Sequence, residues 1–143
     1  MELAAALAAW GDSGSGCALL LGSWTQVEQA AAAVAAADVP VQRLNRELLA
    51  RLDSTEELLA AEANHLAADR TTVVRAALQQ AFEAWLAELP ATVAVRDLEL
   101  LIGERVDLEP LRRVTSRLLL LVPGESAGRS ARLFVVAGRP SQL

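Results

Sequence analysis

The stretch Cys17-Ala18-Leu19-Leu20-Leu21-Gly22-Ser23-Trp24-Thr25 decides the fold of this chain. Its first five residues are apolar, and a run of this length is typical of a strand that is buried on both faces of a sheet. Gly22 ends the run. Thr25 and Glu28 have the T-x-x-E spacing of a capping box, which predicts a helix from there to about Ala37. A buried strand followed at once by a helix is the repeating unit of parallel α/β sheets.

The rest of the chain repeats this alternation of short apolar runs and helical patterns. The apolar runs predict four more strands, over residues 41–44, 91–95, 118–122 and 131–137. The helical patterns predict helices over residues 2–10, 46–52, 54–68, 72–88 and 108–116. We therefore expect an α/β fold of three layers, with helices on both faces of a mostly parallel sheet of about five strands. We expect a single domain over residues 1–143, in which residues 1–16 form an N-terminal helix and a flexible loop.

Polar residues mark several of the predicted helix starts. Asn45 and Asp107 precede the second and the last of the internal helices, and we expect each of them to cap the helix that follows. Ser54 and Glu57 form an S-x-x-E capping box at the start of the helix over residues 54–68. The segment 98–102 is apolar and is predicted as a turn or as an extension of the third strand.

The composition excludes several classes of function. The net charge of −5 and the sequence pI of about 4.9 argue against non-specific binding to nucleic acid or to anionic membranes. All 13 basic residues are arginine, so no reaction can use a lysine amine from this chain. Cys17 is the only cysteine and His65 the only histidine, which excludes cysteine clusters and paired histidine ligands for a metal. We expect a cytoplasmic protein with no signal peptide, no membrane span and no cofactor.

Two stretches have either the spacing or the position of a phosphate-binding loop. Such a loop reads G-x-x-x-x-G-K-[ST]: its amides hold the phosphates, its lysine neutralises them and its hydroxyl holds Mg²⁺. Gly11 to Ala18 has the glycine spacing, but Cys17 and Ala18 replace the last two residues and the loop precedes the strand. Gly22-Ser23-Trp24-Thr25 follows the strand as it should, but it has one glycine and no lysine. We expect the bulky side chain of Trp24 to fill the space that a phosphate would need.

Asp97 is the one candidate for a metal ligand. It follows the strand over residues 91–95, where a carboxylate could reach a bound Mg²⁺. Arg96 is the alternative occupant of that position and would abolish metal binding; both residues also fit as exposed residues at the end of a strand.

Arginines and tryptophans near loops are candidates for contacts with a partner protein, because these side chains often dominate interfaces. Arg112, Arg113 and Arg117 lie on or just after one short helix, where they also fit as a solvated face that pairs with acids such as Glu109. The full set of candidate contact residues is Trp10, Trp24, Arg96, Arg112, Arg113 and Arg117.

Several short stretches occur in an order that resembles a known family. They are Leu19–Gly22 in the first strand, Val39–Leu48 around the second, Asp97–Ile102 after the third, and Asp107–Arg113 with Ser116-Arg117 before the fourth. In this order the chain resembles the small P-loop protein of type 3 BREX phage-exclusion systems, an ATPase-like bacterial component, from about residue 17 to residue 137.

The resemblance implies a P-loop NTPase-like fold and a role in bacterial anti-phage defence. The family pattern has a full glycine-rich loop with Lys and Thr after Gly22, whereas here that loop is contracted to Ser23-Trp24-Thr25. The family also has an acidic residue near the end of the third strand, where Arg96 aligns and Asp97 lies one place on. The resemblance therefore implies a vestigial nucleotide site with no catalytic residue.

Three hypotheses of function follow. The first is a non-catalytic, ATPase-like defence component that acts through protein–protein contacts, either with other defence proteins or with a second copy of itself. The second is an active nucleotide-binding ATPase whose unconventional loop is completed by a partner subunit. The third is an α/β adaptor that has no connection with defence. None of them requires a membrane or a nucleic acid as a direct partner.

Overall fold

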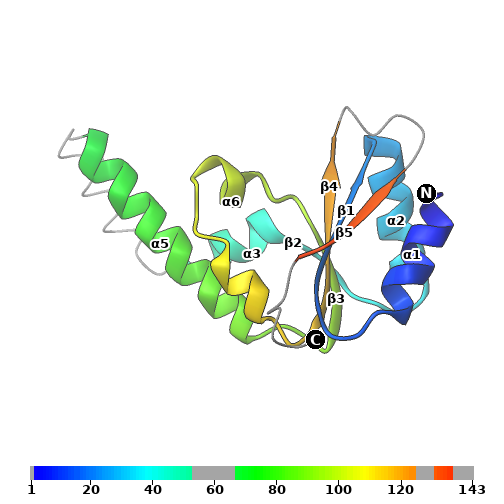
Figure 1. Cartoon of the computed structure of the whole chain (residues 1–143). Helices are drawn as coiled ribbons and strands as arrows, with labels where there is room; N and C mark the ends of the chain where they lie inside the picture. Colours follow the sequence, from blue (N-terminus) through cyan, green and yellow to red (C-terminus); the bar gives the residue numbers. More distant parts are fainter. Residues whose placement is uncertain (1, 53–66, 125–130, 137–143) are drawn as a thin grey trace.

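The structure, a computed structural model, describes residues 2–52, 67–124 and 131–136 of the chain. Its centre is a sheet of five strands in the order β2-β3-β4-β1-β5 (Figure 1). The strands are β1 (Gly16–Gly22), β2 (Val41–Arg43), β3 (Thr92–Arg96), β4 (Arg117–Pro123) and β5 (Arg132–Val135). The helices are α1 (Leu3–Asp12), α2 (Trp24–Ala36), α3 (Leu44–Ala50), α5 (Ala67–Ala87), α6 (Glu99–Gly103) and the 3₁₀-helix η1 (Glu109–Arg113).

The pairing of β1 with β4 is the longest in the sheet. These two strands run parallel over seven residues, from Gly16 opposite Arg117 to Gly22 opposite Pro123. β3 runs parallel to both β4 and β2, whereas β5 runs antiparallel along the other side of β1. The prediction of an α/β chain with a mostly parallel sheet of five strands is confirmed.

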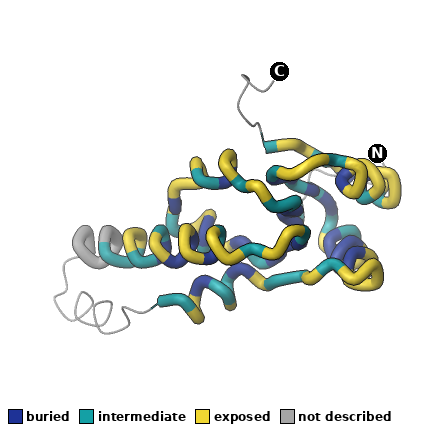
Figure 2. Tube along the Cα trace, turned by 90° about the horizontal axis from the view of Figure 1, so that it is seen from below, coloured by how far each residue is buried: buried dark blue, intermediate teal, exposed yellow. Residues whose placement is uncertain are grey.

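Helices cover both faces of this sheet, and the buried residues lie between them and the strands (Figures 1 and 2). Because successive residues of a strand point to opposite faces, Cys17 of β1 enters one core cluster and Ala18 enters the other. The cluster around Cys17 is completed by residues of α3, α5, α6 and η1. The cluster around Ala18 is completed by α1 and α2.

Trp85 of α5 is the largest buried side chain of the first cluster. Its ring is stacked on that of Phe82, with 6.1 Å between the centroids. Its Nε1 donates a hydrogen bond of 2.7 Å to Oε1 of Gln42 in β2. Trp85 therefore joins α5 to an edge strand of the sheet through both an apolar contact and a polar one.

The start of α2 differs from the prediction. The helix begins at Trp24, and its capping box consists of Ser23 and Gln26; the predicted box of Thr25 and Glu28 is wrong. The Ser23 hydroxyl accepts a hydrogen bond from the amide of Gln26, and the Gln26 side chain accepts one from the amide of Ser23. Glu28 lies inside the helix, and its carboxylate is paired with Arg96.

Asn45 was predicted as a helix cap and has another role. α3 begins at Leu44, with Arg43 at its N-cap, so Asn45 lies inside the first turn. The Asn45 side chain accepts a hydrogen bond of 3.0 Å from the amide of Leu100 and donates one of 3.0 Å to the carboxylate of Glu99. The predicted cap is wrong because the amide side chain connects α3 to α6, a segment far along the chain.

Asp107 precedes η1, which is shorter than the helix predicted over residues 108–116. The predicted cap is wrong, because Leu108 is the N-cap and makes no side-chain cap bond. The Asp107 carboxylate instead accepts a hydrogen bond of 3.0 Å from the amide of Glu109, two residues on, as in an Asx turn. The helix stops early because Val114 is extended and the chain enters β4 at Arg117.

Other helix boundaries in the structure differ from the predicted ones by a few residues. The segment 98–102, predicted as a turn or extension, contains α6. α5 begins at Ala67, earlier than residue 72, and most of the helix predicted over residues 54–68 lies outside the described residues. Among the helices that the structure describes, none has both the length and the apolar character needed to cross a membrane.

Replacement of Trp85 by alanine should destabilise the fold by about 3–5 kcal/mol, because it opens a cavity beside Phe82 and leaves Gln42 without its donor. Trp85→Phe should cost less, since it keeps most of the ring volume. Urea unfolding followed by circular dichroism measures both values. A decrease in the free energy of unfolding of less than about 1 kcal/mol for Trp85→Ala would contradict the conclusion that Trp85 joins α5 to the sheet.

Candidate functional site

The parallel strands end together at one edge of the sheet, which we call the carboxyl edge. In open α/β sheets this edge is where ligands bind, in the crevice beyond the strand ends. Here β1 ends at Gly22, β2 ends at Arg43, β3 ends at Arg96 and β4 ends at Pro123. The candidate site is therefore built from the residues at these ends and from the start of α2.

The start of α2 is closed by its own side chains. The amide of Ser23 donates a hydrogen bond of 2.8 Å to Oε1 of Gln26, and the amide of Gln26 donates one of 3.1 Å to the Ser23 hydroxyl. Gln26 also lies against the backbone of Gly22, where an added Cβ would be 2.9 Å from Oε1. A helix N-terminus binds phosphate through free amides, and two of the amides at this one are already occupied.

The placement of the Trp24 side chain in the space of a phosphate stays a prediction. Trp24 is the first residue of α2, and 62% of its surface is exposed. The side chain that folds back over Gly22 is that of Gln26. Gln26 reaches the N-cap amide because it is the third helical residue, from which a side chain can fold back to that amide.

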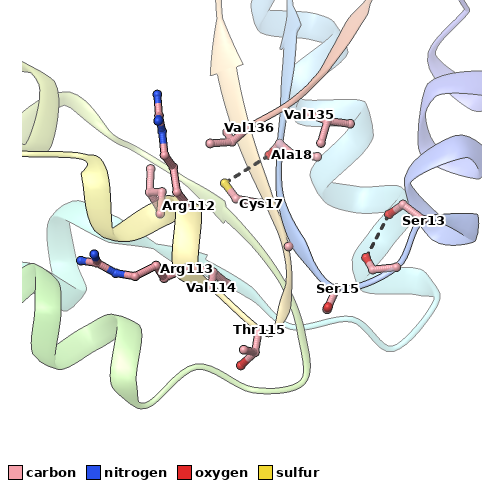
Figure 3. A pocket seen from close by; sticks show the side chains of 13 residues that line it. Ser13, Ser15, Cys17, Ala18, Arg112, Arg113, Val114, Thr115, Val135 and Val136 are labelled. Carbon is pink, nitrogen blue, oxygen red and sulfur yellow. Dashed lines mark hydrogen bonds between the residues drawn. The ribbon is translucent and has the colours of Figure 1, made fainter. Parts of the chain in front are cut away.

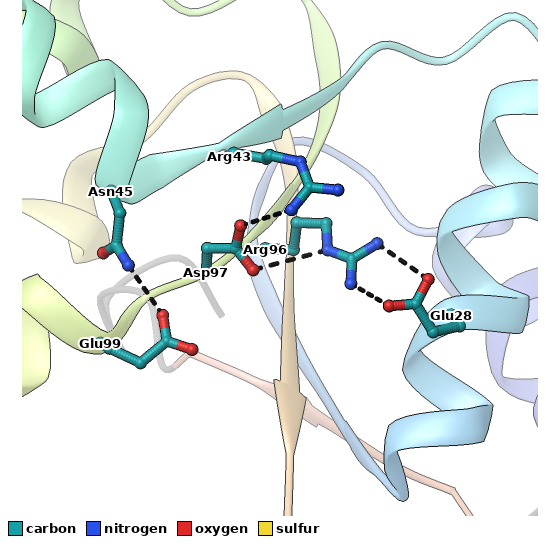
Figure 4. A network of polar contacts seen from close by, with 6 residues as sticks. All are labelled: Glu28, Arg43, Asn45, Arg96, Asp97 and Glu99. Carbon is teal, nitrogen blue, oxygen red and sulfur yellow. Dashed lines mark hydrogen bonds and ion pairs between the residues drawn. The ribbon is translucent and has the colours of Figure 1, made fainter.

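Arg96 is held beneath the carboxyl edge by Glu28 of α2 (Figure 4). Only 9% of Arg96 is exposed, so it is not the exposed strand-end residue that was considered as an alternative. Its Nη1 donates a hydrogen bond of 3.2 Å to Glu28 Oε2, and its Nη2 donates to Oε1. Hydrogen bonding to Arg96 lowers the pKa of Glu28, and the same bond raises the pKa of Arg96.

Asp97 faces two guanidinium groups (Figure 4). Its Oδ2 accepts a hydrogen bond of 2.9 Å from Nη1 of Arg43, and its Oδ1 lies 3.6 Å from Nε of Arg96. The residue has a positive φ of 61°, and its carbonyl accepts a hydrogen bond from the amide of Asn45. Both oxygens of the predicted metal ligand therefore pair with cations of the chain. Within the described residues, no group of three or more His, Cys, Asp or Glu side chains could hold a metal ion.

An apolar pocket of about 310 Å³ lies beside the same edge, between α6 and the end of β4. Ile102, which is 57% exposed, lines it together with Leu98, Val122 and Pro123. This pocket could not be predicted, because the apolar segment 98–102 also fits a turn or an extension of the third strand. A short helix over this segment, with Ile102 on its exposed side, would have indicated an apolar surface here.

The opposite, amino edge carries Arg112, Arg113 and Arg117. Arg112 and Arg113 are exposed on η1 and extend in different directions (Figure 3), and Arg112 Nε lies 3.5 Å from the carboxylate of Glu109. Arg117 begins β4 and is half-buried. A pocket of about 300 Å³ between η1 and the start of β1 is lined mainly by small residues beside these arginines. The two exposed guanidinium groups do not converge on a ligand there.

Trp10, a candidate contact residue, and Cys17, the only cysteine, are both core residues. Trp10 is buried in the cluster beside α2, and its Nε1 has no hydrogen-bond partner among residues that the structure describes. Cys17 is also buried, and burial raises the pKa of its thiol to about 12, so the thiol stays protonated at neutral pH. The six predicted contact residues are therefore divided between the carboxyl edge, the amino edge and the core, and do not form one surface.

Glu28→Gln should lower the thermal midpoint at neutral pH, because Arg96 loses its main anionic partner. Since Glu28 has a lower pKa in the folded state, its stabilising effect is complete above the ordinary value of 4.5 and is lost as the pH falls through the folded-state value. The difference in midpoint from the unmodified protein should therefore shrink below about pH 4.5. Thermal unfolding followed by circular dichroism across this range measures it.

Glu83→Gln is the matched control, because Glu83 is exposed on α5 and has no ion pair within the described part of the chain. This change should leave the midpoint almost unaltered at every pH. A Glu28→Gln effect that is equally large in acid and at neutral pH would contradict the assignment to an ion pair.

Comparisons of this chain with protein-family models, with curated proteins and with solved structures found no match.

Proposed function

We propose that the protein is a non-catalytic component of bacterial anti-phage defence that works in the cytoplasm by binding other proteins. The resemblance to the small P-loop protein of type 3 BREX systems motivates the defence context. The main support for a protein without catalytic activity is the N-terminus of α2, where the side chains of Ser23 and Gln26 accept hydrogen bonds from each other's backbone amides. The absence of lysine from the chain supports the same reading, because the phosphate-binding loop depends on one.

A P-loop NTPase-like ancestry of the fold is part of this proposal. Its support is the order β1, Gly22, α2, with β1 between its parallel neighbour β4 and the antiparallel β5. The glycine is at the end of a central buried strand and the helix follows at once, as in phosphate-binding folds. In this proposal the polar groups that once served a nucleotide have been replaced by contacts within the chain, chiefly Arg96 with Glu28.

The carboxyl edge is the proposed contact surface. Trp24 and Ile102 are exposed at this edge, although large apolar side chains are usually buried, and Ile102 also lines the apolar pocket. Exposed tryptophans frequently supply the largest share of binding energy at interfaces. We expect the partner to be another protein encoded with this one, and to bury Trp24.

The nucleotide test separates this proposal from an ATPase. Thermal unfolding is measured with millimolar Mg-ATP, with Mg-ADP and with Mg²⁺ alone. The expected result is no shift for any of them. A nucleotide present at about 100 times its Kd would stabilise the fold by roughly 2.7 kcal/mol, which is easily measured. A nucleotide-dependent shift, or ATP hydrolysis that appears when products of the neighbouring genes are added, would overturn the non-catalytic reading.

Trp24→Ala tests the contact surface. The protein is co-expressed with the products of the neighbouring genes, and complexes are detected by size-exclusion chromatography. Trp24→Ala should weaken the complex at least tenfold and leave the thermal midpoint of the free protein nearly unchanged, because the side chain is exposed. Leu49→Ala, which removes an equally exposed apolar side chain from α3, is the control and should bind normally. Equal binding by both variants would exclude the carboxyl edge as the contact surface.

A further inference from the structure

Among the strands that the structure describes, β5 lies at one edge of the sheet and pairs with β1 alone. The amide of Val136 donates a hydrogen bond of 2.9 Å to the carbonyl of Cys17. Every second residue before it, namely Phe134 and Arg132, therefore also directs its amide and carbonyl toward β1. In an antiparallel ladder this direction alternates from residue to residue. The amides and carbonyls of Leu133 and Val135 therefore point away from β1, toward a side on which the structure describes no further strand.

The outer edge of β5 is short and apolar after Arg132. Residues 133–136 read Leu-Phe-Val-Val, with no charged residue and no proline. Phe134 is 47% exposed and Val135 is 74% exposed, although both belong to an apolar strand. An apolar edge whose backbone donors and acceptors have no partner within the described part of the chain is a template for another strand.

We infer that this edge pairs with the β5 of a second copy of the chain, antiparallel, about a two-fold axis at Phe134. The inference goes beyond the proposed function and does not depend on it. In this register Leu133 faces the partner's Val135, so the outward amides and carbonyls of both residues are satisfied in both copies. Phe134 faces its own symmetry mate at a position without hydrogen bonds, where side chains come closest and aromatic pairs are favourable.

The charges of β5 do not oppose a second copy in this register. Arg132 is the only charged residue of β5, and here it lies opposite the partner's Val136. The two copies of Arg132 are then at opposite ends of the pairing, about 13 Å apart along the strands, which exceeds the screening length of about 8 Å at physiological salt. Moving the axis toward Arg132 would bring these like charges together. The register that pairs the outward amides and carbonyls of Leu133 and Val135 is therefore also one in which no like charges face each other.

The dimer is expected to be weak. One short strand buries much less than the roughly 1,200 Å² at which stable interfaces begin. Sedimentation velocity from micromolar to millimolar protein should therefore detect a reversible shift from monomer to dimer. A protein that stays monomeric over this whole range would overturn the inference, since the edge would then be free or covered by the chain itself.

Two variants test the edge without breaking the bonds to β1. Val135→Pro removes an outward amide, and proline is tolerated on the free side of an edge strand. Phe134→Lys places two like charges opposite each other across the axis. Both variants should keep the thermal midpoint near that of the unmodified protein and should stay monomeric. A dimer that survives both changes would use another surface and would overturn the inference.

Cysteine scanning tests the register. Phe134→Cys should form a covalent dimer in oxidised glutathione, because facing residues without hydrogen bonds have Cα atoms about 4.5 Å apart, within the range of a disulfide. Val135→Cys is the control, since its two copies lie beyond the roughly 7 Å that a disulfide spans. The native Cys17 is buried and adds little background. At least tenfold less cross-linking at position 135 is expected, and equal cross-linking at both positions would overturn the register.

Discussion

The parallel pairing of β1 with β4 is the interaction on which the rest of the structure depends. Each strand contributes an uninterrupted apolar run, and each run sends alternate residues into the two core clusters. Neither strand has a face left for water, so helices must cover both sides of the sheet. β1 also supplies the pairing surface for β5, and its end sets the position of α2. Loss of this pair would leave both clusters without their centre.

The strands and the fold class could be predicted from the sequence because burial on both faces leaves a local signal. The run from Cys17 to Leu21 is one example, and the run at the centre of β4 is another. The direction of β5 could not be predicted, because an apolar run has the same appearance in either orientation. The shift of helix boundaries by a few residues follows from the same limit, since several polar residues near a helix start are able to cap it.

The polar contacts of the carboxyl edge could not be predicted because they join residues far apart in the chain. Glu28 and Arg96 are separated by 68 positions, and Asn45 and Glu99 by 54. The capping error has a local origin, because Ser23-x-x-Gln26 and Thr25-x-x-Glu28 are two overlapping boxes two residues apart, and α2 uses the earlier one.

The separation of β1 and β4 along the chain has a consequence for how the protein is made. Paired residues such as Gly16 and Arg117 are about a hundred positions apart, so the centre of the sheet cannot form until β4 has left the ribosome. Until then the apolar run of β1 has no neighbour of its own. Contacts this distant in sequence slow folding because a long loop must close first. The nascent chain therefore presents one of its most apolar segments early and buries it late, which makes chaperone assistance during synthesis an expected requirement.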